Sequence, residues 1–118
     1  MYYFILRCHN FIYIRKRNAG DIWQDLHEFV LHESPEELLD PVTGFLPSIL
    51  QGHDYELEYS SGVMKQQLTH QKIQGRFYVV NLRTPAPLLR EYILVNRSNL
   101  NGYAFPRFIN SFLESYPV

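Results

Sequence analysis

The chain begins with the stretch on which its fold prediction rests: Tyr2-Tyr3-Phe4-Ile5-Leu6-Arg7-Cys8-His9-Asn10-Phe11-Ile12-Tyr13-Ile14. Residues 2–6 and 11–14 are rich in β-branched and aromatic side chains, and they flank the turn-prone pair His9-Asn10. This pattern is typical of a β-hairpin. Residues 73–82 carry a second strong strand signal, because the set Ile73, Gly75, Phe77 and Val79 alternates with the set Gln74, Arg76, Tyr78 and Val80. The sequence therefore predicts a sheet that begins at the first residues of the chain.

Helix signals stand between and after these strands. Ser34-Pro35-Glu36-Glu37 predicts a helix start, since Ser34 can cap, Pro35 suits the first helical position and Glu37 completes a capping box. Pro41 is expected to end this helix, and a second short helix is expected over residues 45–50 before Gly52. A last helix is expected from Pro106, with an apolar face made of Phe108, Ile109, Phe112 and Leu113.

Further strands are expected over residues 26–33, 55–64 and 91–95, with a polar connection over 65–72 and a loop over 96–102. The order of strands, helix, strands and helix predicts an α+β fold, in which a mixed β-sheet is packed with helices. No linker, repeat or low-complexity tract divides the chain, so residues 1–118 are expected to form a single domain.

Composition excludes several classes of protein. The 118 residues are 46% hydrophobic and 15% aromatic, which is enough to close one core, so a disordered chain is not expected. Arg7 and His9 interrupt the apolar opening segment, and no run approaches the roughly 20 residues that a membrane span needs. A signal peptide is also missing, so we expect a cytoplasmic protein. Cys8, as the one cysteine, cannot form an internal disulfide or hold an iron–sulfur cluster, and we expect it to be buried.

The charges are unevenly distributed, although the net charge is only -1. Residues 18–64 contain acidic side chains and no Lys or Arg, whereas most of the charged residues in 65–118 are basic. Arg15-Lys16-Arg17 adds a second basic cluster. If folding brings the basic segments together, a neutral protein can present a positive face to phosphate. Solvated surface charge is the alternative for each residue taken alone.

Three stretches together resemble the C-terminal, Nudix-like domain of MutY-type A/G-specific adenine DNA glycosylases. The first runs from Ile14-Arg15-Lys16-Arg17 through Asp21-Ile22-Trp23-Gln24-Asp25-Leu26-His27-Glu28-Phe29. The second is Leu68-Thr69-His70, similar to the Phe-Ser-His or Phe-Thr-His loop of that family, and the third is Tyr103-Ala104-Phe105-Pro106. Leu68 departs from the usual aromatic residue, and Val30 stands where the family often has proline. The order and spacing match across nearly the whole chain.

The resemblance implies a domain that recognises 8-oxoguanine opposite adenine in double-stranded DNA during base excision repair. Thr69 would contact the lesion, His70 would support the loop or reach the DNA backbone, and Leu68 would pack beside the base. Lys65 and Lys72 flank the loop and Gln67 lies within it, which suits contacts to phosphate. An ordinary strand connection, with Thr69 capping a turn, is the alternative interpretation of this segment.

The chemistry of the lesion is consistent with a threonine reader. Oxidation turns N7 of guanine from an acceptor into an N–H donor and adds a carbonyl acceptor at C8. A threonine hydroxyl can accept from N7–H, while a backbone N–H or the hydroxyl itself donates to the new oxygen. We expect no metal ligands and no cofactor in this chain.

The same resemblance implies that adenine excision, and the iron–sulfur cluster, belong to a separate catalytic domain of the parent polypeptide. The isolated chain is therefore expected not to be an enzyme, to partner that catalytic domain, and to work at the nucleoid of a bacterium. Two alternatives are a Nudix-type nucleotide pyrophosphohydrolase and a protein-interaction module. The hydrolase would need carboxylates to hold magnesium, for which Glu36, Glu37 and Asp40 are the candidates. The hydrolase signature, an Arg-Glu pair followed by a further Glu-Glu pair and glycine, is missing, because Leu38-Leu39 and Pro41 occupy the region and residues 18–64 contain no Arg. The nine tyrosines would suit an interface, although aromatic residues also fill small cores.

Overall fold

The opening segment forms the central strand of a mixed sheet. In the computed structural model, which describes residues 1–18, 20–34 and 40–118, β1 (Tyr2–Cys8) is buried along its whole length. It pairs in parallel with β7 (Lys72–Leu82) and antiparallel with β2 (Phe11–Lys16). The hairpin predicted over residues 2–14 is confirmed, and His9 in its turn adopts a φ of 57°.

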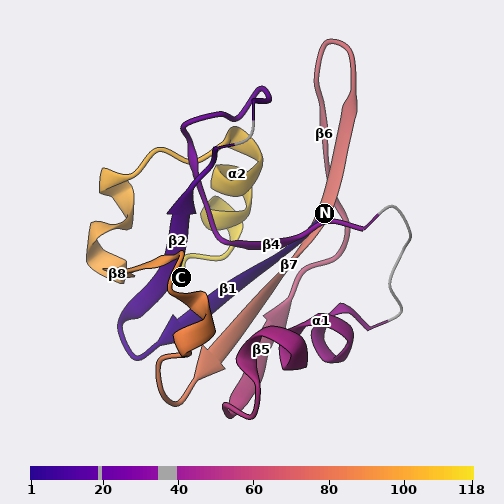
Figure 1. The fold of residues 1–118 in the computed structure, drawn as a ribbon. Coiled ribbons are helices and arrows are strands. Elements are labelled where there is room, and N and C mark those ends of the chain that lie inside the picture. The colour runs from indigo at the N-terminus through magenta and orange to yellow at the C-terminus, as the bar shows by residue number, and fades with distance from the viewer. Residues whose placement is uncertain (19, 35–39) are drawn as a thin grey trace.

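Further strands extend the sheet on both sides of β1 (Figure 1). In the described residues, every pair except β1–β7 is antiparallel, so the sheet is mixed, as predicted. The remaining strands are β3 (His27–Glu28) and β8 (Ile93–Asn96), which pair with β2, β4 (Val30–His32), which pairs with β1, and β5 (Tyr55–Ser60) and β6 (Met64–Gln67), which pair with β7.

The central strands of the sheet are covered on both faces. Successive side chains of a strand point to opposite sides, so each of these strands contributes to two cores. On one face, Phe4 and Leu6 of β1 meet α1 (Pro41–Leu50) and the short 3-10 helix η1 (Pro87–Leu89). On the other face, Tyr3 and Ile5 meet α2 (Arg107–Ser115). The result is a helix layer on each side of the sheet, which is the α+β architecture expected from the sequence.

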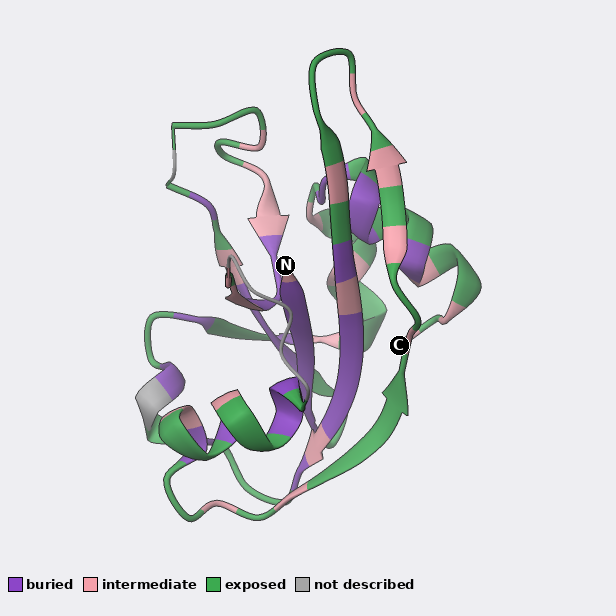
Figure 2. Cartoon of the chain, turned by 90° about the vertical axis from the view of Figure 1, so that its right-hand side faces the viewer, coloured by how far each residue is buried: buried purple, intermediate pink, exposed green. Residues whose placement is uncertain are grey.

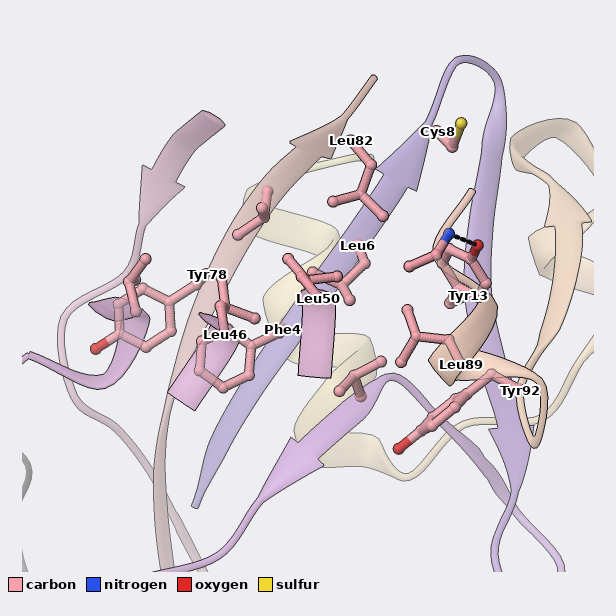
Figure 3. Close-up of a cluster of buried hydrophobic side chains, with 14 of the residues drawn as sticks. Phe4, Leu6, Cys8, Tyr13, Leu46, Leu50, Tyr78, Leu82, Leu89 and Tyr92 are labelled. Carbon is pink, nitrogen blue, oxygen red and sulfur yellow. Dashed lines mark hydrogen bonds between the residues drawn. The ribbon is translucent and has the colours of Figure 1, made fainter. Parts of the chain in front are cut away.

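The core on the α1 side contains one buried polar contact. Figure 3 shows Tyr13 pointing into this cluster beside Leu6 and Leu89. Its hydroxyl accepts a hydrogen bond of 3.0 Å from the backbone N–H of Ala86. The contact satisfies a buried donor, and it ties the segment before η1 to β2. Cys8 is 3% exposed in the same cluster, as expected for a small apolar side chain, and burial raises the pKa of its thiol.

Helix α1 begins earlier than the sequence predicts. Pro41, expected to end a helix, is instead its first residue, where a proline needs no amide donor. Asp40 caps the helix, since its carboxylate accepts from the amide of Thr43 at 3.2 Å. The helix ends at Leu50, and Gln51 and Gly52 follow with φ of 37° and 84°. The helix start predicted at residues 34–37 lies largely outside the described residues.

The helix predicted near the end of the chain is confirmed. Pro106 stands immediately before the first residue of α2, which buries Phe108, Ile109 and Phe112 against the sheet and leaves Leu113 half-buried. The segment 96–102, expected as a loop, contains the 3-10 helix η2 (Arg97–Gly102). Within the part of the chain that the structure describes, no helix is long and apolar enough to cross a bilayer.

The segment 55–72 is corrected by the structure. The strand expected over 55–64 ends at Ser60, and a new strand, β6, begins at Met64. Four residues that were expected in the polar connection over 65–72, Lys65, Gln66, Gln67 and Lys72, are therefore strand residues. Alternation was hidden in β6 because lysine and glutamine occupy three of its four positions.

Gly75 allows β7 to pass close to two other parts of the molecule. A Cβ at this position would lie 2.9 Å from the backbone oxygen of Met1 and 3.2 Å from Cε2 of Phe108. Gly75 is also opposite Met64 in the β6–β7 pair. Because Gly75 has no side chain, this part of β7 can lie against α2 while it pairs with β6.

Replacing Gly75 with alanine should destabilise the domain. We expect Gly75→Ala to lower the free energy of unfolding by about 1–3 kcal/mol, because a rigid backbone oxygen must move. Urea unfolding followed by circular dichroism measures this. Gly62→Ala is the matched control, since a Cβ there has open space, and it should change stability by less than about 0.5 kcal/mol. Equal effects for the two variants would contradict the packing argument.

Candidate functional site

The residues predicted to contact DNA lie on one β-hairpin that projects from the sheet (Figure 1). β1 pairs with β7 only from Arg76 onward, whereas β6 pairs with the segment from Lys72 to Gly75. The first four residues of β7 therefore extend beyond the main sheet together with β6. Figure 2 shows this ribbon exposed at its tip and buried where β7 enters the sheet.

The hairpin has two different faces. Lys65 is opposite Gln74, and Gln67 is opposite Lys72, so these four side chains share one face, and all are exposed. The other face carries Met64 and Ile73, which are half-buried and pack against the core on the α2 side. The apolar face holds the base of the hairpin to the domain, and the polar face presents two positive charges to solvent.

Leu68–Gln71 form the loop at the tip of the hairpin. The amide of Leu68 donates to the carbonyl of Gln71 at 2.7 Å, which closes the turn. The side-chain amide of Gln67 donates to the carbonyls of Leu68 and Gln71 at 2.8 and 3.2 Å. Thr69 and His70 are exposed at the tip, and Leu68 is half-buried. The loop is thus shorter than the sequence predicts, and its ends are fixed by hydrogen bonds.

The structure brings all the predicted site residues together on this hairpin. Thr69, His70 and Leu68 lie in the loop, whereas Lys65, Gln67 and Lys72 lie in the strands beside it. Their roles toward DNA remain predictions. Gln74 lies on the same polar face, opposite Lys65 and farther from the loop, and no DNA contact is assigned to it. Lys65 and Gln67 are two residues apart, as are Lys72 and Gln74, and this is the spacing of side chains on one face of a strand.

The basic cluster at residues 15–17 is arranged differently from the hairpin lysines. Glu28 is 1% exposed, and its carboxylate accepts from Arg15 Nε at 3.0 Å and from Arg17 Nη1 at 2.5 Å. Arg17 also forms an ion pair with Asp21. The positive charges of these two arginines are therefore largely compensated within the domain, and they add little to a positive face.

The electrostatics of this cluster follow from its burial. Desolvation alone would lower the pKa of Arg17, but hydrogen bonds and charge from Glu28 and Asp21 outweigh it and raise the pKa above its ordinary value. The same balance with Glu28 raises the pKa of Arg15. Both guanidinium groups therefore stay charged, as the buried carboxylate requires.

Two cavities adjoin the ion-pair cluster. The larger, of about 540 Å³, has walls of mixed charge; it is lined by Arg15, Lys16, Arg17, Asn18, Glu28, Leu31, Glu33 and Glu91. The smaller, of about 320 Å³, lies beside the hairpin and extends to its loop; it is lined by Met1, Arg17, Asp21, Ile22, Trp23, Glu33, Gln71 and Ile73. Among the described residues, no group of three or more His, Cys, Asp or Glu side chains could hold a metal ion.

Comparison with known protein families agrees with this geometry. Residues 2–115 match the sequence model of the NUDIX domain. The chain belongs to the NUDIX domain family. No curated protein matches it. In this NUDIX domain the helix after the first strands, α1, has the sequence Pro-Val-Thr-Gly-Phe-Leu-Pro-Ser-Ile-Leu and contains no acidic residue.

Of the carboxylates considered for magnesium, Asp40 is the one that the structure describes. Its side chain caps α1 by accepting from Thr43, and this contact lowers the pKa of the carboxyl group. Glu36 and Glu37 lie outside the described residues. The capping bond gives Asp40 a structural role that needs no metal.

Removing the charge of Glu28 should strongly destabilise the NUDIX domain. Glu28→Gln leaves Arg15 and Arg17 without their buried counter-charge, so we expect a loss of about 3–5 kcal/mol in the free energy of unfolding. Glu91→Gln is the control, because Glu91 also contacts Arg15 but its side chain is 68% exposed; its loss should stay below about 1 kcal/mol. Urea unfolding measures both. A loss from Glu28→Gln no larger than that of the control would show that the buried pair is not a stabilising element.

Proposed function

We propose that this chain is the lesion-recognition domain of a MutY-type adenine DNA glycosylase, and that it reads 8-oxoguanine opposite adenine in double-stranded DNA. The observation that carries the proposal is the β6–β7 hairpin, which presents Thr69 and His70 at an exposed tip beside one face with Lys65 and Lys72. Loops held by a rigid scaffold are common sites of recognition. Membership of the NUDIX domain family supports the same assignment, because the glycosylase domain that the sequence resembles is Nudix-like.

The proposed contacts divide into reading and positioning. Thr69 accepts from N7–H of the oxidised base and donates to the C8 oxygen, with Leu68 packed beside the base and His70 next to the DNA backbone. Lys65 and Lys72 contact phosphates, which orient the hairpin without reading the sequence. The exposed polar face suits this division, since both lysines lie on one side of the ribbon.

In this proposal the isolated chain is not an enzyme. Adenine excision, and the iron–sulfur cluster, belong to the catalytic domain of the same parent polypeptide. That polypeptide works in the cytoplasm of a bacterium, at the nucleoid. The domain described here raises affinity and selectivity for the mispair, and we propose that it binds DNA without a cofactor or metal of its own.

Hydrolysis of nucleoside diphosphate derivatives is the competing function, because the chain is a NUDIX domain. The absence of acidic residues from α1 weighs against it, since such chemistry needs several carboxylates around magnesium. A magnesium-dependent hydrolysis assay on nucleotides separates the two functions: turnover that Asp40→Asn abolishes would favour the hydrolase. The third possibility, a protein-interaction module, predicts that no duplex perturbs the hairpin.

Titration with DNA tests the reading role of Thr69. Amide chemical shifts of the domain are followed while a duplex with 8-oxoguanine:adenine, or with guanine:adenine, is added at the same salt concentration. We expect residues 68–72 to respond more strongly to the lesion duplex, and Thr69→Ala to reduce the preference by about 5- to 150-fold, which corresponds to about 1–3 kcal/mol.

Thr84→Ala is the control for this titration. Thr84 is an exposed threonine beyond the opposite end of β7, so its loss should leave the preference unchanged. Equal responses to the two duplexes in the wild-type domain would reject the lesion-reading function.

The salt dependence of binding tests the phosphate contacts. Lys65→Gln and Lys72→Gln should each weaken binding to both duplexes alike, and each should reduce the slope of log K against log salt by about 1, because one fewer counterion is released. Lys16→Gln is the control, and it should leave the slope unchanged. The ammonium group of Lys16 is exposed on β2, outside the hairpin, and lies 4.0 Å from the carboxylate of Asp25. An unchanged slope for the hairpin variants would remove both lysines from the interface.

A further inference from the structure

The loop at the hairpin tip is held by the side chain that immediately precedes it. Gln67 Nε2 donates to the carbonyl of Leu68 at 2.8 Å and to the carbonyl of Gln71 at 3.2 Å. These two carbonyls stand on either side of Thr69 and His70. A primary amide has two N–H donors, so one side chain can make both bonds. The carbonyl of Gln71 also accepts from the amide of Leu68, at 2.7 Å.

This arrangement matters because a two-stranded ribbon has little stability of its own. Met64 and Ile73 anchor the base of the hairpin through their packing against the core, but Thr69, His70 and Gln71 at the tip are exposed. An exposed tip without internal bonds samples many conformations, and ordering it on binding reduces affinity. Bonds that fix both ends of the loop reduce that entropic loss before any ligand arrives.

We infer that Gln67 is a positioning residue: its side-chain amide pre-organises the loop so that Thr69 is presented in the conformation that reads the base. The inference rests on the proposed function, and it assigns Gln67 a role different from the phosphate contact expected from sequence. Gln67 acts through the backbone of the loop. Its amide nitrogen donates to the carbonyls of Leu68 and Gln71, so it is already occupied within the loop. Its contribution to binding is therefore the conformation of the loop that reads the lesion.

The hairpin supplies a matched control for this residue. Gln74 is also an exposed glutamine on the polar face, but it stands opposite Lys65, farther from the loop than Gln67, which stands opposite Lys72. Replacing either glutamine removes one amide from the same surface. A general effect of surface polarity would therefore appear in both variants, whereas a positioning effect would appear in one.

The experiment compares Gln67→Met and Gln74→Met with the wild-type domain. Methionine keeps the length of the side chain and removes both donors. In the free domain, backbone ¹⁵N relaxation should show a loss of order at residues 68–71 in Gln67→Met alone. In the titrations with 8-oxoguanine:adenine and guanine:adenine duplexes, Gln67→Met should reduce the preference for the lesion by about 2- to 10-fold, the range expected for one or two neutral hydrogen bonds. Affinity for the unmodified duplex should stay the same.

Several outcomes overturn the inference. It fails if the loop of Gln67→Met remains as ordered as in the wild type, if the loop loosens while the lesion preference is unchanged, or if Gln74→Met has the same effects. Failure of the proposed function is recognised separately and earlier, because the wild-type domain itself would then show no preference between the two duplexes. Thermal unfolding of both variants verifies that they are folded at the temperature of the titration.

Discussion

The architecture depends on the burial of β1 on both of its faces. Each residue from Tyr2 to Cys8 is buried, and the strand has a neighbour on each side, β2 and β7. A strand in this position satisfies its backbone hydrogen bonds within the sheet, but both rows of its side chains must be covered. Helix α1 covers the row with Phe4 and Leu6, and helix α2 covers the row with Tyr3 and Ile5. The two-layered covering of the sheet follows from this one strand.

The site is a consequence of the same strand. β1 begins at Tyr2 and pairs there with Arg76, but β7 begins four residues earlier, at Lys72. Those extra residues have no partner in β1, and β6 pairs with them instead. The exposed hairpin is therefore continuous with the most buried strands of the domain. This continuity gives a small polar loop a firm support, as the proposed reading of a single altered base would require.

Charge is used in two ways in this nearly neutral chain. Arg15 and Arg17 are held by the buried Glu28, so their contribution is to hold the end of β2, and the residue that follows it, against β3. Lys65 and Lys72, in contrast, stand on the exposed polar face of the projecting β6–β7 hairpin. The uneven distribution of charge along the sequence thus becomes internal ion pairs in one region and a small basic surface in another. Net charge is a poor guide to such a surface because it sums the charges of the internal ion pairs and those of the exposed lysines.

The sequence by itself determined the elements whose signals are local. The opening hairpin, the strand at β7 and the helix at α2 follow from alternation, turn residues and a helical apolar face, which neighbouring residues establish together. It also placed the candidate loop around Thr69. Tertiary structure alone decided the parallel pairing of β1 with β7, the start of α1 at Pro41, and the partner of each arginine. The strand pairing and the ion pairs join residues that are separated in the chain. A proline is compatible locally with the end of one helix or with the first residue of the next, so the structure was needed to show which of the two Pro41 is.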